Sequence, residues 1–291
     1  MPLTSCIIAS RGEGEVLQRT VADIYAKATG DIEVIVGFDG PPYQTFSYYP
    51  NFSIVIEPEV IGIKRMLNRL ADAATGKYIF KTDAHCMFSP GFDETLAAHM
   101  QDNWVVTPRF YVLDAAHWAW QDERFYDAFY LSCPFTDSRG WRFKAGGHWP
   151  ERTKERLHIP IDETPQMHGS AWFVNRQYFL DVLRFPEWDP LGHAQEPPWL
   201  GLGAWLTGGA LMVNKLCWYA HMHQQGNRRG YHMSQAQEKL SYKLHADYWM
   251  LNKRPNRIHD IEWFISKFMP MPTWPADWRD LYADWLVNRG N

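Results

Sequence analysis

The stretch Lys77-Tyr78-Ile79-Phe80-Lys81-Thr82-Asp83-Ala84-His85-Cys86 decides our prediction of the fold. The short apolar run Tyr78-Ile79-Phe80 follows Gly76 and is typical of a buried strand. Asp83 and His85 follow two residues apart, so at a strand end their side chains point the same way. A carboxylate and an imidazole so placed can hold one divalent cation, which can in turn hold a diphosphate. The alternative is a half-buried histidine beside a capping aspartate.

Composition limits the classes to which the chain can belong. The 291 residues are 46% hydrophobic and 21% charged, as in a globular chain with a core. No apolar run approaches the ~20 residues that span a bilayer, and the N-terminus lacks the pattern of a signal peptide. We therefore expect no anchor and no membrane partner. Four cysteines without a CxxC pair favour a reducing cytoplasm, that of a bacterium or a virus-infected cell.

Apolar periodicity predicts alternating strands and helices in the first part of the chain. We expect helices over 16–28 and 63–75, and strands at 7–9, 33–38, 53–56 and 78–80. This order predicts an α/β fold with a mostly parallel central sheet, whose ligands bind at the carboxyl ends of the strands. No GxGxxG or Walker loop is present, so dinucleotide and P-loop chemistry are not expected.

The second part of the chain is harder to interpret. Residues 109–165 mix aromatic and charged side chains with few periodic runs, and we expect a loop-rich acceptor region there. Gly169 and Ser170 precede an apolar strand and would let a backbone approach a ligand closely. Asn175 is placed to cap the helix that follows.

Spaced motifs resemble the catalytic domain of the polypeptide N-acetylgalactosaminyltransferases, which have a glycosyltransferase-A fold. Residues 62–86 resemble the family's Gly-x-x-Arg helix and its Asp-Ser/Ala-His-Cys metal motif, and residues 164–179 its Thr-Pro-x-Met-x-Gly-Gly strand. Glu196 stands twelve residues before Gly208, as the family's glutamate does, and His221 stands where the family keeps its third metal ligand. Residues 246–250 resemble a late helix of the family.

The resemblance implies a UDP-sugar donor and an ion, Mn²⁺ or Mg²⁺, bound by Asp83, His85 and His221. His223 stands two residues further on, so either of the two late histidines can be the third ligand. The resemblance makes Glu196, Asp83 and Arg65 the candidate catalytic residues. The candidate donor-binding residues are Ala9, Arg11, Asp39, Arg65, Ala84, Gly169 and Ser170. Taken alone, Asp39 can also open an Asp-Gly-Pro turn and Arg65 can be a solvated helix residue.

The predicted function is transfer of a hexosyl or N-acetylhexosaminyl group to a hydroxyl of a macromolecule. The resemblance implies retention at the anomeric carbon, whereas Glu196 acting as a general base would favour inversion. Basic and aromatic residues at 227–232 and 239–257 favour a hydroxymethylated DNA base as the acceptor, as in phage DNA modification. The net charge of −4 favours a plain solvated surface instead.

Other functions stay open at this stage. The family's own acceptor is a Ser or Thr hydroxyl of a protein. A module that binds a sugar nucleotide or DNA without turnover is the alternative of another class, and a sugar-1-phosphate nucleotidyltransferase shares the general sheet. We expect a catalytic domain over 1–250, with a nucleotide-sugar half (1–108) and an acceptor half (109–230). An aromatic extension over 251–291 would cap the sheet or help to hold the acceptor.

Overall fold

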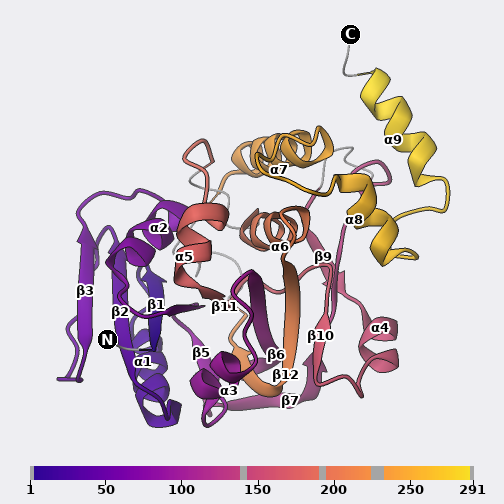
Figure 1. Ribbon diagram of the computed structural model, residues 1–291. Coiled ribbons are helices and arrows are strands. Elements are labelled where there is room, and N and C mark those ends of the chain that lie inside the picture. The colour runs from indigo at the N-terminus through magenta and orange to yellow at the C-terminus, as the bar shows by residue number, and fades with distance from the viewer. Residues whose placement is uncertain (1–2, 138–142, 190–194, 224–232, 289–291) are drawn as a thin grey trace.

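The computed structural model describes residues 3–137, 143–189, 195–223 and 233–288. Its centre is a ten-stranded mixed sheet (Figure 1). In spatial order the main path is β10 (Ile161–Glu163), β12 (Ala210–His221), β6 (Trp104–Asp114), β11 (Ala171–Asn175), β4 (Tyr78–Thr82), β1 (Thr4–Ser10), β2 (Ile32–Asp39) and β3 (Phe52–Glu57). Off this path, β5 (Cys86–Phe88) pairs with β12 and β7 (Ala119–Tyr126) with β6. A separate pair joins β8 (Phe129–Leu131) and β9 (Ala145–His148).

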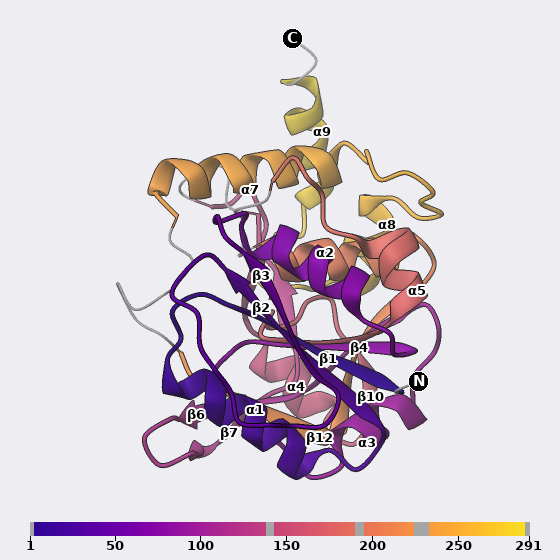
Figure 2. The same ribbon diagram turned by 90° about the vertical axis from the view of Figure 1, so that its left-hand side faces the viewer.

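The first half of the sheet has the predicted parallel arrangement. Strand β1 pairs in parallel with β2 and β4, and β2 with β3. Alternate residues of β1 face opposite layers, so Ile7 packs in the cluster of α2 (Ile63–Ala73) and Ile8 in that of α1 (Glu15–Lys27). Figure 2 shows these two helices on opposite sides of the strands. Because helices cover both of their faces, β1, β2 and β4 are almost entirely buried, whereas β3 at the edge of the sheet is partly exposed.

The second half differs from the mostly parallel sheet that we expected. Strand β11 is antiparallel to both β4 and β6, and β7 and β10 add further antiparallel pairs. The loop-rich interpretation of 109–165 is wrong, since this range holds the end of β6, strands β7 to β10 and α4 (Pro150–Glu155). Most of β7 is exposed, and its run of charged residues conceals the alternation by which a strand is recognised.

Shorter elements connect the sheet to its outer layers. Helix α3 (Phe92–Ala98) follows β5, while α5 (Arg176–Tyr178) and the π-helix η1 (Phe179–Leu183) follow β11. The predicted cap is confirmed, because the Asn175 side chain accepts hydrogen bonds from the backbone N–H groups of Gln177 and Tyr178.

The C-terminal segment packs on the same core as the sheet. Helix α6 (Glu196–Leu206) lies under α7 (Gln235–Met250), with α8 (Ile261–Phe268) beside it and α9 (Trp278–Val287) beyond (Figure 1). Buried aromatic residues of α8 and α9 belong to one hydrophobic cluster with those of α6. Trp274 Nε1 donates to the carbonyl of Leu131 at 2.6 Å, and the Tyr282 hydroxyl donates to that of Met250 at 2.5 Å. Among the residues that the structure describes, no helix has both the length and the apolar character to cross a bilayer.

A buried polar cluster ties α7 to α2. Asp189 Oδ2 accepts hydrogen bonds from Lys64 Nζ at 2.9 Å and Ser241 Oγ at 2.6 Å, and lies 2.8 Å from His245 Nε2. Burial lowers the pKa of His245 to about 4. Burial would raise the pKa of Asp189, but its hydrogen bond with His245 and the Lys64 charge outweigh burial and lower that pKa.

We expect this cluster to make the fold sensitive to acid. A histidine whose pKa is near 4 when folded and about 6.5 when unfolded contributes stability that is complete above pH 6.5 and lost as the pH falls toward 4. At pH 5.5 the loss assigned to His245 is on the order of 1 kcal/mol. Urea unfolding at pH 7.5 and 5.5 should show a smaller pH effect in His245→Gln than in wild type. The exposed His158→Gln is the control, and an equal pH effect in all three proteins would contradict the assignment.

Candidate active site

Strand pairing brings the sequence-distant parts of the site together. Strand β4 ends at Thr82, and the backbone N–H of Asp83 donates to the carbonyl of Ser170 at 2.8 Å, beside the start of β11. After the next turn, β5 runs antiparallel to β12, with Cys86 opposite His221. His221 therefore lies beside His85, although 136 residues separate them in the chain.

Asp83, His85 and His221 converge on one point. Each offers a ligand atom, and these atoms all lie within 4.8 Å of one another. His85 Nε2 lies 3.0 Å from His221 Nε2, and Asp83 Oδ2 lies 3.2 Å from that same His221 atom. One oxygen and two nitrogens in this arrangement suit a divalent ion such as Mn²⁺. His223 is not in this group, so His221 is the late histidine that meets the Asp83–His85 pair.

Glu13 lies beside His85, one of the three candidate metal ligands, a contact that the sequence did not predict. Its Oε2 lies 3.1 Å from His85 Nδ1, and its side chain is largely buried. A carboxylate on one imidazole nitrogen favours the proton there and leaves the lone pair of Nε2 for an ion. The side chains of Asp83, His85 and His221, with Glu13 beside them, are therefore suited to binding a divalent cation.

We expect Glu13→Gln to weaken binding of Mn²⁺ by about 10–100-fold, because the histidine ligand loses the charge that orients it. Calorimetric titration of the metal-free protein with Mn²⁺ measures this affinity. Glu15→Gln, at the start of α1, is the matched control. Equal affinities in Glu13→Gln and wild type would show that Glu13 does not orient His85.

Lys81 is a fully buried cation at the centre of the site, and it too was not predicted. Its Nζ donates to Asp83 Oδ1 at 2.7 Å and to the carbonyl of Gly169 at 2.7 Å, and it lies 2.9 Å from Glu196 Oε1. Burial alone would lower the pKa of Lys81, but the two carboxylates outweigh burial and raise that pKa, so Lys81 is charged. Asp83 thus gives one oxygen to Lys81 and turns the other toward the histidines.

The pKa values of the two carboxylates move in opposite directions. Burial would raise the pKa of Asp83, but Lys81 and His221 outweigh burial and hold that pKa well below its usual range. Burial raises the pKa of Glu196, and Lys81 offsets only part of the rise. Glu196 also accepts a hydrogen bond from Trp172 Nε1 at 2.6 Å, which fixes the carboxylate in the core.

Gly169 and Ser170 lie against this group. A Cβ atom at Gly169 would come within 2.9 Å of Pro197 Cγ, so glycine allows the start of α6 to pack closely here. The Ser170 hydroxyl donates to that of Tyr219 at 2.9 Å, inside the core.

Two residues that we predicted to bind the sugar donor, Asp39 and Arg65, form hydrogen bonds within the protein instead. Asp39, which is fully buried, accepts hydrogen bonds from the backbone N–H groups of Ile61 at 2.6 Å and Gly62 at 3.0 Å. Arg65 Nε donates to Glu187 Oε2 at 2.8 Å, in a half-exposed ion pair. These bonds fix the start of α2 and hold α2 to the segment before residue 190.

The remaining predicted residues lie at the carboxyl ends of β1 and β4. Ala9 is a buried residue of β1, and Arg11 is half-buried just after that strand. Ala84 is buried between the two metal-ligand candidates, and its carbonyl accepts a hydrogen bond from Thr20 Oγ1 at 3.1 Å.

Comparisons with known proteins agree with this geometry. A model of the family described as glycosyl transferase family 2 matches residues 5–183. The human polypeptide N-acetylgalactosaminyltransferase 15 is 28% identical over 167 residues, which are 55% of this chain and 24% of that protein.

Two solved structures share the fold. The crystal structure of GalNAc-T7 with UDP, GalNAc and Mn²⁺ has a TM-score of 0.65 at 15% identity, over 87% of this chain and 50% of that one. The structure of S. aureus TarS 1-349 in complex with UDP-GlcNAc has a TM-score of 0.52 at 12% identity, over 79% and 61% of the two chains. The matched part is thus less than two thirds of each of these three relatives.

The predicted α/β class with a glycosyltransferase-A type of sheet is confirmed by these structural neighbours. Since the family model covers more than half of the sequence, the chain belongs to glycosyl transferase family 2 and is a glycosyltransferase.

Proposed function

We propose that this chain transfers a sugar from a UDP-sugar to a hydroxyl group, using Mn²⁺ or Mg²⁺ bound by Asp83, His85 and His221. The observation that carries the proposal is the convergence of one carboxylate and two imidazoles at the carboxyl end of β4. The ligands named for the neighbours support it, since GalNAc-T7 was crystallised with UDP and Mn²⁺ and TarS with UDP-GlcNAc.

The bound ion would offset the negative charge that develops on the diphosphate as it leaves. The chain's own residues prepare that site. Lys81 holds Asp83 in one orientation, Glu13 orients His85, and the burial of Lys81 keeps its charge from being screened by water.

Glu196 has a positioning role in this proposal. Among the described residues, Lys81 and Trp172 both contact its Oε1 and fix the carboxylate beside Gly169. We favour retention at the anomeric carbon. A product of inverted configuration would instead assign Glu196 as the general base.

The rest of the donor would lie along the ends of β1, β2 and β4. In this proposal Ala9, Arg11 and Ala84 line the nucleotide, and Gly169 and Ser170 lie behind the sugar. Asp39 and Arg65 would meet the donor by exchanging their present bonds with the α2 start and with Glu187.

The first acceptor that we propose is a hydroxymethylated DNA base, which would have to be flipped out of a duplex. Lys239 and Lys243 lie one turn apart on α7, and both are exposed, as are Lys253 and Arg257. Basic side chains so placed can follow phosphates. The predicted segment 227–232 lies outside the described residues.

A protein Ser or Thr hydroxyl is the second acceptor, and two observations favour it. The human relative is named as a polypeptide transferase. Arg254, counted above among the basic residues, is buried over the Trp199 ring and therefore cannot reach a phosphate.

Release of UDP from a panel of UDP-sugars, with Mn²⁺ or with excess EDTA, tests the function. We expect slow Mn²⁺-dependent hydrolysis without an acceptor, and faster release with either hydroxymethylated DNA or a Ser/Thr peptide. Binding of UDP-sugar without release under any condition would favour the non-catalytic binding module. Product mass and anomeric configuration then identify the acceptor and the stereochemistry.

A further inference from the structure

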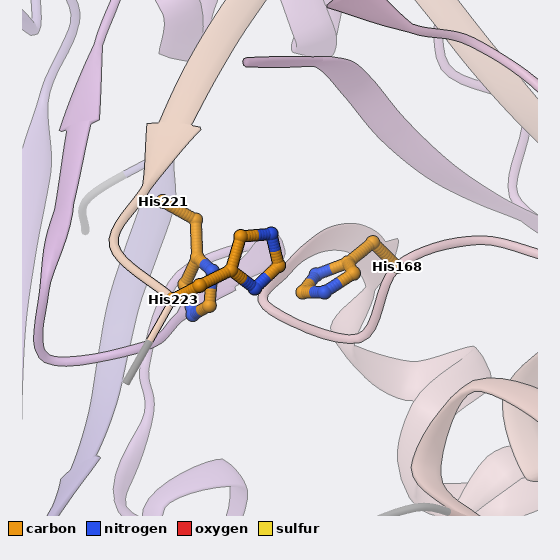
Figure 3. Close-up of side chains that lie close together, drawn as sticks. All are labelled: His168, His221 and His223. Atoms are coloured by element: carbon orange, nitrogen blue, oxygen red, sulfur yellow. The ribbon is translucent and has the colours of Figure 1, made fainter. Parts of the chain in front are cut away.

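Three histidines lie close together next to the proposed donor site, and the proposed function does not account for this group. His168 precedes β11, His221 ends β12 and His223 follows two residues later (Figure 3). Each offers one nitrogen, and the three nitrogens lie within 4.8 Å of one another. His221 is largely buried, and its Nδ1 has no hydrogen-bond partner among the residues that the structure describes.

The spacing of the three rings is that of ligands around one small cation. The ring centroids of His168 and His221 are 5.0 Å apart, those of His221 and His223 5.2 Å, and those of His168 and His223 5.4 Å. Three imidazoles bound tetrahedrally at the usual Zn–N distance would have centroids about 5.2 Å apart. Packed aromatic rings can share this spacing, but packing alone does not require a nitrogen of each ring to converge.

A hydrogen-bond chain orients His168 for this role. Its Nδ1 lies 2.6 Å from Ser170 Oγ, and Ser170 donates its own proton to the Tyr219 hydroxyl. Ser170 therefore accepts from His168 Nδ1–H, which leaves the lone pair of Nε2 for a ligand. The Phe110 ring stacks on His168 with centroids 4.7 Å apart and holds the imidazole in place.

We propose that His168, His221 and His223 form a second cation site, which binds Zn²⁺ or a similar ion such as Co²⁺. Three imidazoles without a carboxylate suit these ions better than Mn²⁺ or Mg²⁺, which prefer oxygen ligands. Because His221 belongs to both groups, an ion at the all-histidine site weakens binding of Mn²⁺ to Asp83, His85 and His221, and the effect is reciprocal. Zinc-class ions would thereby reduce an activity that depends on Mn²⁺, and only this consequence rests on the proposed function.

The test uses the 291-residue chain with the Asp83–His85–His221 group disrupted by two substitutions, Asp83→Asn and His85→Ala. Titration of this metal-free protein with Zn²⁺, and the visible spectrum with Co²⁺, report the second site without any need for turnover. We expect one bound ion per chain and the intense spectrum of four-coordinate Co²⁺. Adding His168→Ala or His223→Ala should weaken Zn²⁺ binding at least about tenfold. His158→Ala, an exposed histidine outside both groups, should not.

The outcomes separate this inference from the proposed function. No Zn²⁺ binding by the doubly substituted chain, or unchanged binding in both His168→Ala and His223→Ala, overturns the second site. His223 is exposed, so its replacement keeps the test valid if His168→Ala does not fold. Mn²⁺-dependent release of UDP by the wild-type chain is measured separately, and its absence would refute the proposed function while leaving the Zn²⁺ result unaffected.

Discussion

Replacing Asp83 with asparagine is expected to reduce metal-dependent transfer by about 10²–10⁴-fold, because the ion loses its one charged ligand and the several kcal/mol of stabilisation that it supplies. The amide keeps the size of the carboxylate, and its oxygen can still accept a hydrogen bond from Lys81, so the fold should survive. UDP release measured across Mn²⁺ concentrations tests this, with thermal unfolding to verify the fold.

The control for that experiment is Asp277→Asn, which removes an exposed carboxylate just before α9. It should behave as wild type. Undiminished activity of the Asp83 variant in excess EDTA would refute the role of the ion. Activity that is restored by raising the Mn²⁺ concentration would locate the defect in binding of the ion.

Replacing Lys81 with methionine is expected to lower the free energy of unfolding by about 3–5 kcal/mol. The methionine fills the space but leaves Glu196 and Asp83 without the cation that lies 2.9 and 2.7 Å from their oxygens. The buried carboxylate of Glu196 and the partly exposed one of Asp83 then lie close together without a cation, and one must take up a proton or move. Urea unfolding at pH 7.5 measures the change.

A second substitution separates charge from packing in that result. In Lys81→Met with Glu196→Gln, one buried carboxylate is gone, and we expect part of the lost stability to return. The exposed Lys77→Met, four residues earlier, should unfold at the same urea concentration as wild type. A loss in Lys81→Met no larger than that in Lys77→Met would show that the buried charge does not hold the two acids.

The residues around β4 could be predicted because their signals are local. A strand followed by Asp83 and His85 needs only the alternation of side chains, and apolar periodicity likewise located the two helices that alternate with the first four strands. Lys81 carried a signal of the same kind, since it is a charge inside an apolar strand two residues before Asp83. In a strand buried on both sides, such a charge needs a partner.

Other contacts depend on pairing that periodicity does not encode. Glu13, in the turn after β1, contacts His85, which follows 72 residues later in the chain. Asp39 looked available at the end of β2, yet the loop before α2 takes both of its oxygens through backbone N–H groups. Which polar groups a loop satisfies depends on its path in space, and that path has no pattern in the sequence.

The pairing of β5 with β12 has a consequence for biosynthesis. In the proposed site, a nascent chain has two of the three ligands, Asp83 and His85, until residue 221 has left the ribosome, and binding is incomplete without the third. Tight binding of the proposed ion must therefore follow the pairing of a late strand with an early one, and contacts between such distant parts of a chain form slowly. An emerging chain should remain unable to cleave its donor until nearly the whole sheet has assembled.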